Sequence, residues 1–182
     1  MPLTQLDDVA ALVVIDLQKG IAAIPTAQPA SEIASRTAQL ARAFRKRGMP
    51  VVLVNVAGRA PGRTDAGPPK LNFPPNWTEL MPELEQQPGD LLVTKHRVGA
   101  FIGTQLHEQL QQRGVTQIFL TGIATSAGVE STARSAYDHG YNVVFMTDAM
   151  TDRDADAHRY CVEKIFPRFG ETATTENVLK ML

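Results

Sequence analysis

The chain has 182 residues, of which 43% are hydrophobic, so we expect a single domain over residues 1–182 with a sizeable core. A formal net charge of -1, with Lys and Arg scattered along the chain, excludes a strongly basic protein, and we expect no nucleic-acid partner. No apolar run approaches the roughly 20 residues that cross a bilayer, and no secretion signal opens the chain, so we expect a cytoplasmic protein without a membrane partner.

Short apolar runs alternate with helical patterns along the chain. Four β-branched runs cover residues 11–17, 50–56, 115–123 and 141–149, and another apolar run covers 91–97. Continuous rather than alternating apolarity is typical of strands covered on both faces. Helices are expected at 31–48, with Ser31 as N-cap, at 103–113, 131–139 and 154–165, and from Thr174 or Thr175 onward. This alternation predicts an α/β fold with a doubly wound parallel sheet.

The segment 58–90 is the one long irregular stretch, and it is rich in Pro and Gly. Loops of this length in compact domains are more often functional than idle. The segment is expected to serve as a lid or as an interface, and the residues do not decide between the two.

Polar residues that directly follow the apolar runs are the first candidates for a site, because ligands bind at the carboxyl ends of parallel strands. Asp16 follows "LVVI" within the first run, and Lys95 ends the apolar part of the run at 91–97. Burial at the edge of the core raises a carboxyl pKa and suits the group to acid or base work, and a Lys within about 5 Å would supply a fixed positive charge. The structural alternative is that both side chains are solvated or capping.

Several stretches together resemble the isochorismatase-like, or cysteine hydrolase, superfamily. They are "VVIDLQ", "TKHRVGAFIGTQLHEQL", "TGIATSAGVESTARSAYDHGYNVVFMTDA" and, more loosely, "TTENVLKML". The resemblance implies a six-stranded parallel sheet with helices on both faces. It also implies an Asp, Lys and Cys triad in the amidase members, with Asp16 and Lys95 at the first two positions. Gly128 occupies the position of the nucleophilic Cys.

A glycine cannot form a thioester, so covalent amidase chemistry is excluded at Gly128. The single Cys161 lies in a helical stretch and is interpreted as a buried structural thiol. A weaker alternative makes Ser126 a nucleophile with Asp148 and His158 as partners. The resemblance favours a third route, because the isochorismatases proper look like members that also have Gly at this position. In that route Asp16 donates a proton and water completes the hydrolysis.

Cofactors and metals are not expected. The nicotinamidase members of the superfamily bind a metal through an Asp and two His residues on the loop after the second strand, whereas residues 51–95 contain no His. The loop sequence "IATSAGVES" resembles the amidase branch rather than the isochorismatases, so the substrate stays open.

Further substrate-binding candidates lie near the expected strand ends and on the loops, and each also has a structural interpretation. Arg97 could bind a carboxylate with its planar fork or form a structural ion pair. Aromatic residues could line the pocket or belong to the core, and the polar ones could orient substrate or stabilise loops. The full set is Gln18, Asn55, Trp77, Arg97, Phe101, Ala124, Thr125 and Ser126, and the resemblance adds a cis peptide bond before Ala124.

The leading hypothesis is a hydrolase of a small organic substrate that uses Asp16, Lys95 and water, for example on a vinyl ether. The competing hypothesis is a catalytically silent homologue that binds a ligand or partner through the same crevice. The resemblance also implies a homodimer or homotetramer.

Overall fold

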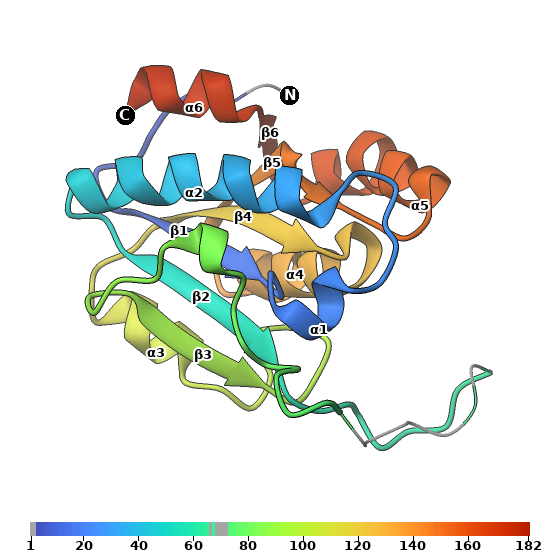
Figure 1. Ribbon diagram of the computed structural model, residues 1–182. Coiled ribbons are helices and arrows are strands. Elements are labelled where there is room, and N and C mark those ends of the chain that lie inside the picture. The colour runs from blue at the N-terminus through green and yellow to red at the C-terminus, as the bar shows by residue number, and fades with distance from the viewer. Residues whose placement is uncertain (1–2, 66, 68–72) are drawn as a thin grey trace.

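A computed structural model describes residues 3–65, 67 and 73–182 (Figure 1). Its centre is one sheet of six parallel strands in the order β3-β2-β1-β4-β5-β6, which confirms the predicted fold class. The strands are β1 (Ala10–Ile15), β2 (Val51–Val56), β3 (Leu91–Lys95), β4 (Gln117–Ile123), β5 (Asn142–Thr151) and β6 (Glu171–Ala173). Every residue of β1 and β4 is buried, as their continuous apolarity predicts.

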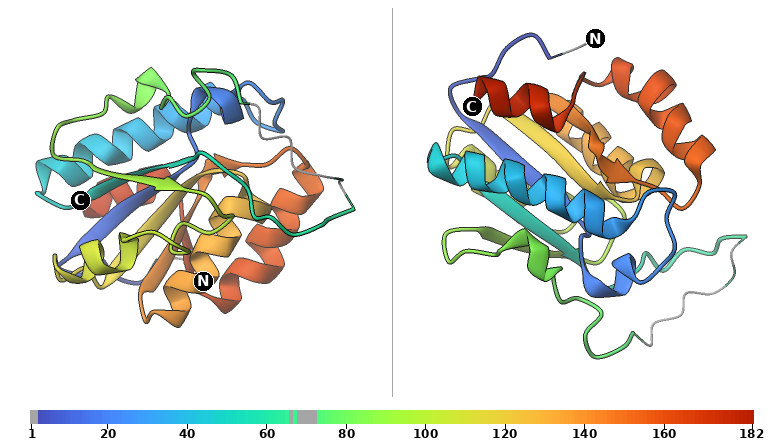
Figure 2. Two further views of the ribbon diagram at one scale, coloured as in Figure 1. Left: turned by 90° about the horizontal axis from the view of Figure 1, so that it is seen from below. Right: turned by 45° about the horizontal axis from the view of Figure 1, so that its top comes forward.

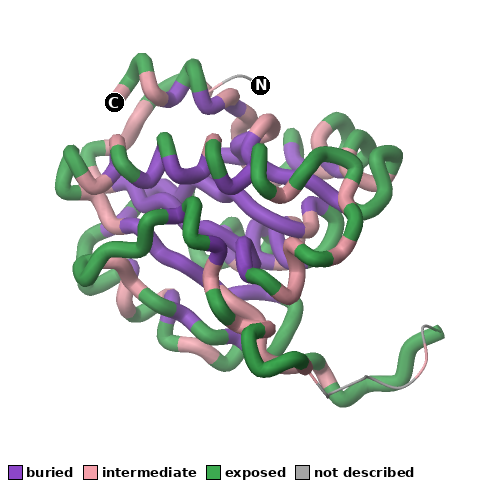
Figure 3. Tube along the Cα trace, in the orientation of Figure 1, coloured by how far each residue is buried: buried purple, intermediate pink, exposed green. Residues whose placement is uncertain are grey.

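Helices cover both faces of this sheet, and the strands between them form the buried centre of the molecule (Figure 3). One face packs against α1 (Lys19–Ala22), α2 (Ala30–Lys46) and α6 (Thr175–Met181). The other packs against α3 (Leu106–Gln111), α4 (Glu130–Asp138) and the segment that follows α5 (Ala155–Tyr160). The helices α2 and α6 lie side by side on their face (Figure 2).

The helix boundaries differ from the predicted ones where side chains or turns intervene. The N-cap of α2 is Pro29 rather than Ser31, and no side chain caps it. The helix α3 starts three residues later than predicted, because Thr104 donates to the carbonyl of Ala100 and accepts from the N–H of Leu106 within a turn. Thr174 does cap α6, by accepting from the N–H of Asn177.

Wider turns adjoin two of the predicted helices, and one of them replaces the second half of the helix predicted at 154–165. A π-helical turn, η2 (Thr125–Val129), precedes α4, and another, η3 (Cys161–Ile165), continues α5 into the short 3-10 turn η4 (Phe166–Arg168). The turn η2 brings the chain from the end of β4 directly over the end of β1.

The described parts of the 58–90 segment behave in two ways. Residues 61–65 are exposed and run out from the body of the molecule (Figure 1). Further along, Met81 donates its N–H to the carbonyl of Leu17, Leu80 pairs with Gln18, and the 3-10 turn η1 (Pro82–Leu84) buries Leu84. The second half therefore packs onto the sheet, and its role as lid or interface stays a prediction. No helix of the described residues has the length and apolarity to cross a membrane.

Candidate functional site

Asp16 and Lys95 meet at the carboxyl edge of the sheet. Asp16 directly follows β1, and Lys95 ends β3, which is separated from β1 by β2. Lys95 Nζ lies 2.8 Å from Asp16 Oδ2, and the two side chains are 2% and 7% exposed. The predicted proximity of the two side chains is therefore confirmed. The two groups form an ion pair that is almost completely buried.

The surroundings of Asp16 favour its protonated form. Burial raises the pKa of its carboxyl group from 3.8 to about 6, although the charge and the hydrogen bond of Lys95 act in the opposite direction. Its second oxygen, Oδ1, is buried and has no hydrogen-bond partner among the described residues. The backbone of Asp16 has a φ of 51°, a conformation that non-glycine residues adopt rarely and that occurs in turns and at functional sites.

Gly128 stands against this carboxyl group. A Cβ added at Gly128 would lie 3.3 Å from Asp16 Oδ2 and 2.9 Å from Ile15 Cγ2. The carbonyl of Gly128 accepts a hydrogen bond of 2.6 Å from Thr132 Oγ1, which fixes the turn η2 to α4. A side chain at position 128 would therefore project toward the acid.

Gly122 makes the close approach of β4 and β1 possible. Its φ is +118°, and a Cβ there would lie 1.9 Å from the carbonyl oxygen of Ile15. Only glycine fits such a position, where the register of β4 against β5 also shifts. The strand ends that carry the site can therefore converge.

The residues between Ile123 and Gly128 are held by the segment that follows β5. The expected cis peptide bond joins Ile123 and Ala124. Thr125 Oγ1 lies 2.8 Å from His158 Nδ1, and Asp152 Oδ2 accepts from both the N–H and the hydroxyl of Ser126 at 2.7 Å. The sequence reading missed Asp152, although this acid directly follows β5 and is only 5% exposed.

The alternative triad of Ser126, Asp148 and His158 is wrong. Asp148 accepts from the N–H and hydroxyl of Thr175 at the start of α6, while His158 bonds Thr125. The pKa of the His158 imidazole is lowered, because the effect of burial exceeds the opposite effect of the nearby Asp152. The three groups are thus occupied by three different partners.

Three of the other candidates contact parts of the framework, and no hydrogen bond joins them to the pair among the described residues. Gln18 is fully buried, and its amide bonds the main chain of Val56 and Trp77. Asn55 lies on the sheet face opposite Lys95, because residues alternate along β2 and Val54, not Asn55, shares the face of the β3 residues Val93 and Lys95. Asn55 donates to the carbonyl of Thr78 instead.

Phe101 also belongs to the framework. It is 8% exposed and lies within the core under α3 and α4, with its ring centroid 5.2 Å from that of His139. The side chains of Gln18, Asn55 and Phe101 therefore hold the strand ends and loops in place rather than face the carboxyl group of Asp16.

A cavity of about 750 Å³ opens at the carboxyl ends of β2 and β3. Its walls include Arg97, one of the predicted residues, which is exposed. They also include Arg59, Phe73 and His96, which the sequence reading missed although Arg59 and His96 follow the strand ends by only a few residues. Trp77 stacks on Phe73 with ring centroids 4.5 Å apart and so supports this wall from behind.

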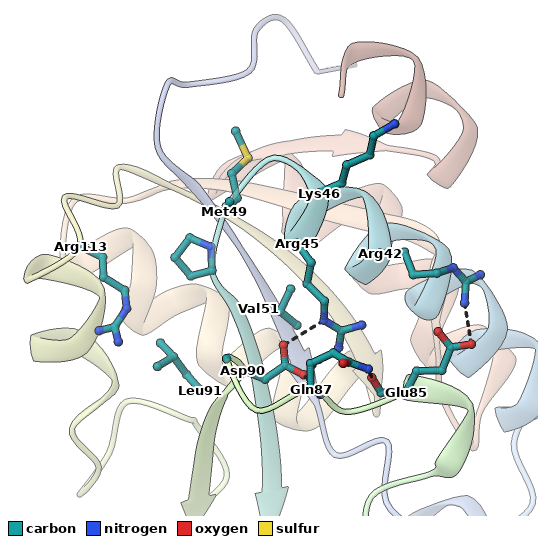
Figure 4. Close-up of a pocket in the computed structure, with 13 residues that line it drawn as sticks. Arg42, Arg45, Lys46, Met49, Val51, Glu85, Gln87, Asp90, Leu91 and Arg113 are labelled. Atoms are coloured by element: carbon teal, nitrogen blue, oxygen red, sulfur yellow. Dashed lines mark hydrogen bonds and ion pairs between the residues drawn. The ribbon is translucent and has the colours of Figure 1, made fainter.

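Another cavity of comparable size, about 710 Å³, lies at the amino edge of the sheet beside the first residues of β2 and β3 (Figure 4). Two of its cations are paired, since Arg45 bonds both oxygens of Asp90 and Arg42 bonds Glu85. The Asp16–Lys95 pair belongs to the opposite edge. This cavity is therefore separate from the pair.

Cys161 has the properties of a structural thiol. It is 3% exposed, and burial together with the neighbouring Glu130 raises the pKa of the thiol to about 12. Its sulfur donates to Glu130 Oε2 at 3.3 Å. Within residues 3–65, 67 and 73–182, no group of three or more His, Cys, Asp or Glu side chains is arranged to hold a metal ion.

Comparisons with known proteins agree with this fold. Residues 10–177 match the isochorismatase domain. An uncharacterized isochorismatase family protein of Bacillus subtilis, YwoC, is 41% identical over 94% of this chain and 93% of its own. The isochorismatase of Bacillus subtilis is 30% identical over 86% of this chain and 52% of its own. The solved structure of an isochorismatase family protein from Burkholderia thailandensis superposes with a TM-score of 0.91, at 45% identity and 97% coverage of both chains. The chain therefore belongs to the isochorismatase family of hydrolases.

Proposed function

We propose that the protein hydrolyses a small organic substrate with an acid-labile bond of the vinyl ether type, using Asp16 as proton donor and water in place of a covalent nucleophile. The observation that carries the proposal is the asymmetry of the Asp16 carboxyl group. Lys95 holds Oδ2, whereas Oδ1 is buried without a partner among the described residues. A carboxyl group with one free oxygen and a raised pKa can carry the proton that the reaction needs.

Each step of the reaction has a residue to support it. The proton on Asp16 is transferred to the vinylic carbon, which leaves an oxocarbenium ion and a carboxylate. Lys95 stabilises that carboxylate because its ammonium already lies 2.8 Å away. Water then adds to the cation and returns a proton to Asp16, and the resulting hemiacetal breaks its carbon–oxygen bond to give a carbonyl compound and an alcohol.

Gly128 decides against the amidase route. The family includes amidohydrolases, and a ureidoacrylate amidohydrolase of Variovorax paradoxus is 34% identical over 56% of this chain and 41% of its own. Position 128 offers no nucleophile for an acyl-enzyme, and Cys161 is too buried and too weakly acidic to replace it. The 30% identity to an isochorismatase supports the vinyl ether route.

The test is turnover of isochorismate, nicotinamide, and carbamoyl and ureido amides by the purified protein. We expect hydrolysis of a vinyl ether and a loss of at least about 100-fold in kcat for Asp16→Asn. Asp90→Asn is the matched control, because it removes another buried carboxylate that pairs with a cation, at the far edge of the sheet. Unchanged turnover in Asp16→Asn would disprove the role of this acid.

The near-complete burial of the Asp16–Lys95 pair supports a second candidate, a protein that binds a ligand at this edge without turning it over. The same assay separates the two, since wild-type protein that binds but never hydrolyses any of these compounds is the outcome that favours binding alone. Assembly into a homodimer or homotetramer is part of the proposal in both cases, and sedimentation measures it.

A further inference from the structure

The cavity at the carboxyl ends of β2 and β3 is cationic. Its described lining contains two guanidinium groups, of Arg59 and Arg97, and one imidazole, of His96, but no Asp or Glu. Among the described residues, no carboxylate forms an ion pair with either Arg. The contrast with the amino-edge cavity is direct, because there Arg45 and Arg42 face acidic partners. The two guanidinium groups at the carboxyl edge can therefore pair with an anionic ligand.

The two guanidinium groups keep most of their hydrogen-bonding capacity. Arg59 Nη2 donates to Thr64 Oγ1 at 3.2 Å, and Arg97 Nη1 donates to the carbonyl of His96 at 2.8 Å. Each of these contacts uses one nitrogen of a group that has five N–H donors. A planar fork of donors fits a carboxylate better than a single ammonium does.

The cavity is coupled to the Asp16–Lys95 pair through the main chain. The ammonium of Lys95, which holds Asp16, also donates to the carbonyl of Arg97 at 3.2 Å. The walls themselves are in contact, since Ala57 donates its N–H to the carbonyl of Lys95 and a Cβ on Gly58 would lie only 2.7 Å from His96 Nδ1. The ammonium that holds Asp16 therefore also holds the main chain of a residue that lines the cavity.

An apolar wall completes the cavity. Phe73 and Ile102 line it, and Ile102 is 52% exposed. Phe73 is supported by the stacked ring of Trp77, whose indole N–H is fixed on the carbonyl of Val56 at 2.9 Å. A stacked pair of rings beside two guanidinium groups favours a flat molecule with one anionic end.

We propose that this cavity binds the carboxylate of a planar organic substrate, with Arg59 and Arg97 as its donors and Phe73 as the stacking wall. The proposal rests on the hydrolytic function proposed above and specifies its substrate class. The link between this cavity and the Asp16–Lys95 pair is the hydrogen bond from the Lys95 ammonium to the carbonyl of Arg97.

Three small probes test the proposal by calorimetric titration: benzoate, the neutral isostere benzamide, and inorganic phosphate. We expect benzoate to bind about tenfold more tightly than either of the others, because only benzoate combines a carboxylate with a flat ring. Equal affinity for benzamide would overturn the role of charge, and equal affinity for phosphate would overturn the planar body. Failure of benzoate to bind at millimolar concentration would overturn the proposal as a whole.

Matched variants locate the binding. Arg59→Gln and Arg97→Gln are each expected to weaken benzoate about tenfold, whereas Arg113→Gln, in the amino-edge cavity, is expected to leave it unchanged. Arg97→Lys keeps the positive charge but loses the planar pair of donors. Its affinity for benzoate should therefore lie between those of wild type and Arg97→Gln. If Arg113→Gln weakens benzoate as much as Arg97→Gln does, the assignment to this cavity is wrong.

The outcome also separates this proposal from the hydrolytic one. Asp16→Asn is expected to abolish turnover but to retain benzoate binding, because it removes the acid and leaves Arg59 and Arg97 in place. With a substrate that is turned over, Arg59→Gln and Arg97→Gln should raise KM much more than they lower kcat. Turnover with an unchanged KM in both variants would overturn the carboxylate site while leaving the role of Asp16 intact.

Discussion

Lys95 holds Oδ2 of Asp16 at 2.8 Å, and the other oxygen of the same carboxyl group is buried without a partner among the described residues. One oxygen is thus fixed by the ammonium, and the other is the oxygen that carries the proton in the proposed reaction. The pKa of the group lies near 6 because burial outweighs the effect of the ammonium. The following predictions depend on this relationship.

The rate of hydrolysis should fall as the pH rises above about 6, because the mechanism needs Asp16 in its protonated form. The fall should approach tenfold per pH unit once most of the carboxyl group is ionised. The measurement is kcat between pH 5 and pH 8, with far-UV circular dichroism at each pH to show that the fold persists. A kcat that rises over this range would instead identify Asp16 as a base.

Much of the fold follows from short-range patterns. The runs around Val13, Val52 and Leu120 are continuously apolar because both faces of the sheet are covered, and this periodicity alone predicts buried strands. The short strand β6 gives no such signal, since only three residues pair and they include Glu171 and Thr172. Its place is set by packing against β5, which local sequence does not encode.

The site was predictable only where strand ends determine it. Asp16 and Lys95 end apolar runs, and parallel strands bring such ends together. Asn55 is the residue before the last one of β2, yet it lies on the opposite face, since a single step along a strand reverses the side chain. Arg59 and Phe73 come together only through the path of the loop, which no periodicity fixes.

Lys95→Met should destabilise the protein more at pH 8 than at pH 5. Removal of the ammonium leaves the Asp16 carboxylate buried and unpaired, a loss of about 3–5 kcal/mol in the free energy of unfolding. At pH 5 the loss should be smaller, because the folded state can take up a proton on Asp16. The measurement is urea denaturation of wild type and variant at both pH values.

The direction of this pH dependence follows from the pKa of Asp16, which is raised in the folded state from 3.8 to about 6. The folded protein therefore binds more protons than the unfolded chain between these values, and this contribution to stability is present at low pH and lost as the pH rises through about 6. Without Lys95 the upper limit moves to higher pH. Lys19→Met, which breaks an exposed pair with Glu79, is the control and should show no such pH dependence. An equal loss at both pH values in Lys95→Met would contradict the assignment.

Gly128→Cys should create a reactive thiol beside Asp16. The new Cβ would lie 3.3 Å from Asp16 Oδ2, so the carboxylate can act as a base toward the thiol. We expect one iodoacetamide adduct by mass spectrometry in this variant and none in wild type, because the native Cys161 is buried with a pKa of about 12.

Gly128→Ala is the control that separates the reactivity of the new thiol from the steric cost of a side chain at this position. Its Cβ would come within 2.9 Å of Ile15 Cγ2, so we expect both variants to lose about 1–3 kcal/mol of stability through overpacking. Modification of Cys161 in folded wild-type protein, or an inert thiol in Gly128→Cys at full stability, would show that the position does not face the acid as described.

Ser126→Ala should retain hydrolysis, whereas Asp152→Ala should lose both stability and activity. Asp152 accepts from the N–H and from the hydroxyl of Ser126, and only the hydroxyl bond disappears in Ser126→Ala. In Asp152→Ala the main-chain N–H at position 126 also loses its acceptor, which costs about 1–3 kcal/mol and loosens the turn that places Gly128 against Asp16. Thermal melting and kcat of both variants measure the difference. A Ser126→Ala protein that folds normally but has no activity would restore the serine as a reacting group and contradict the direct addition of water to the cation.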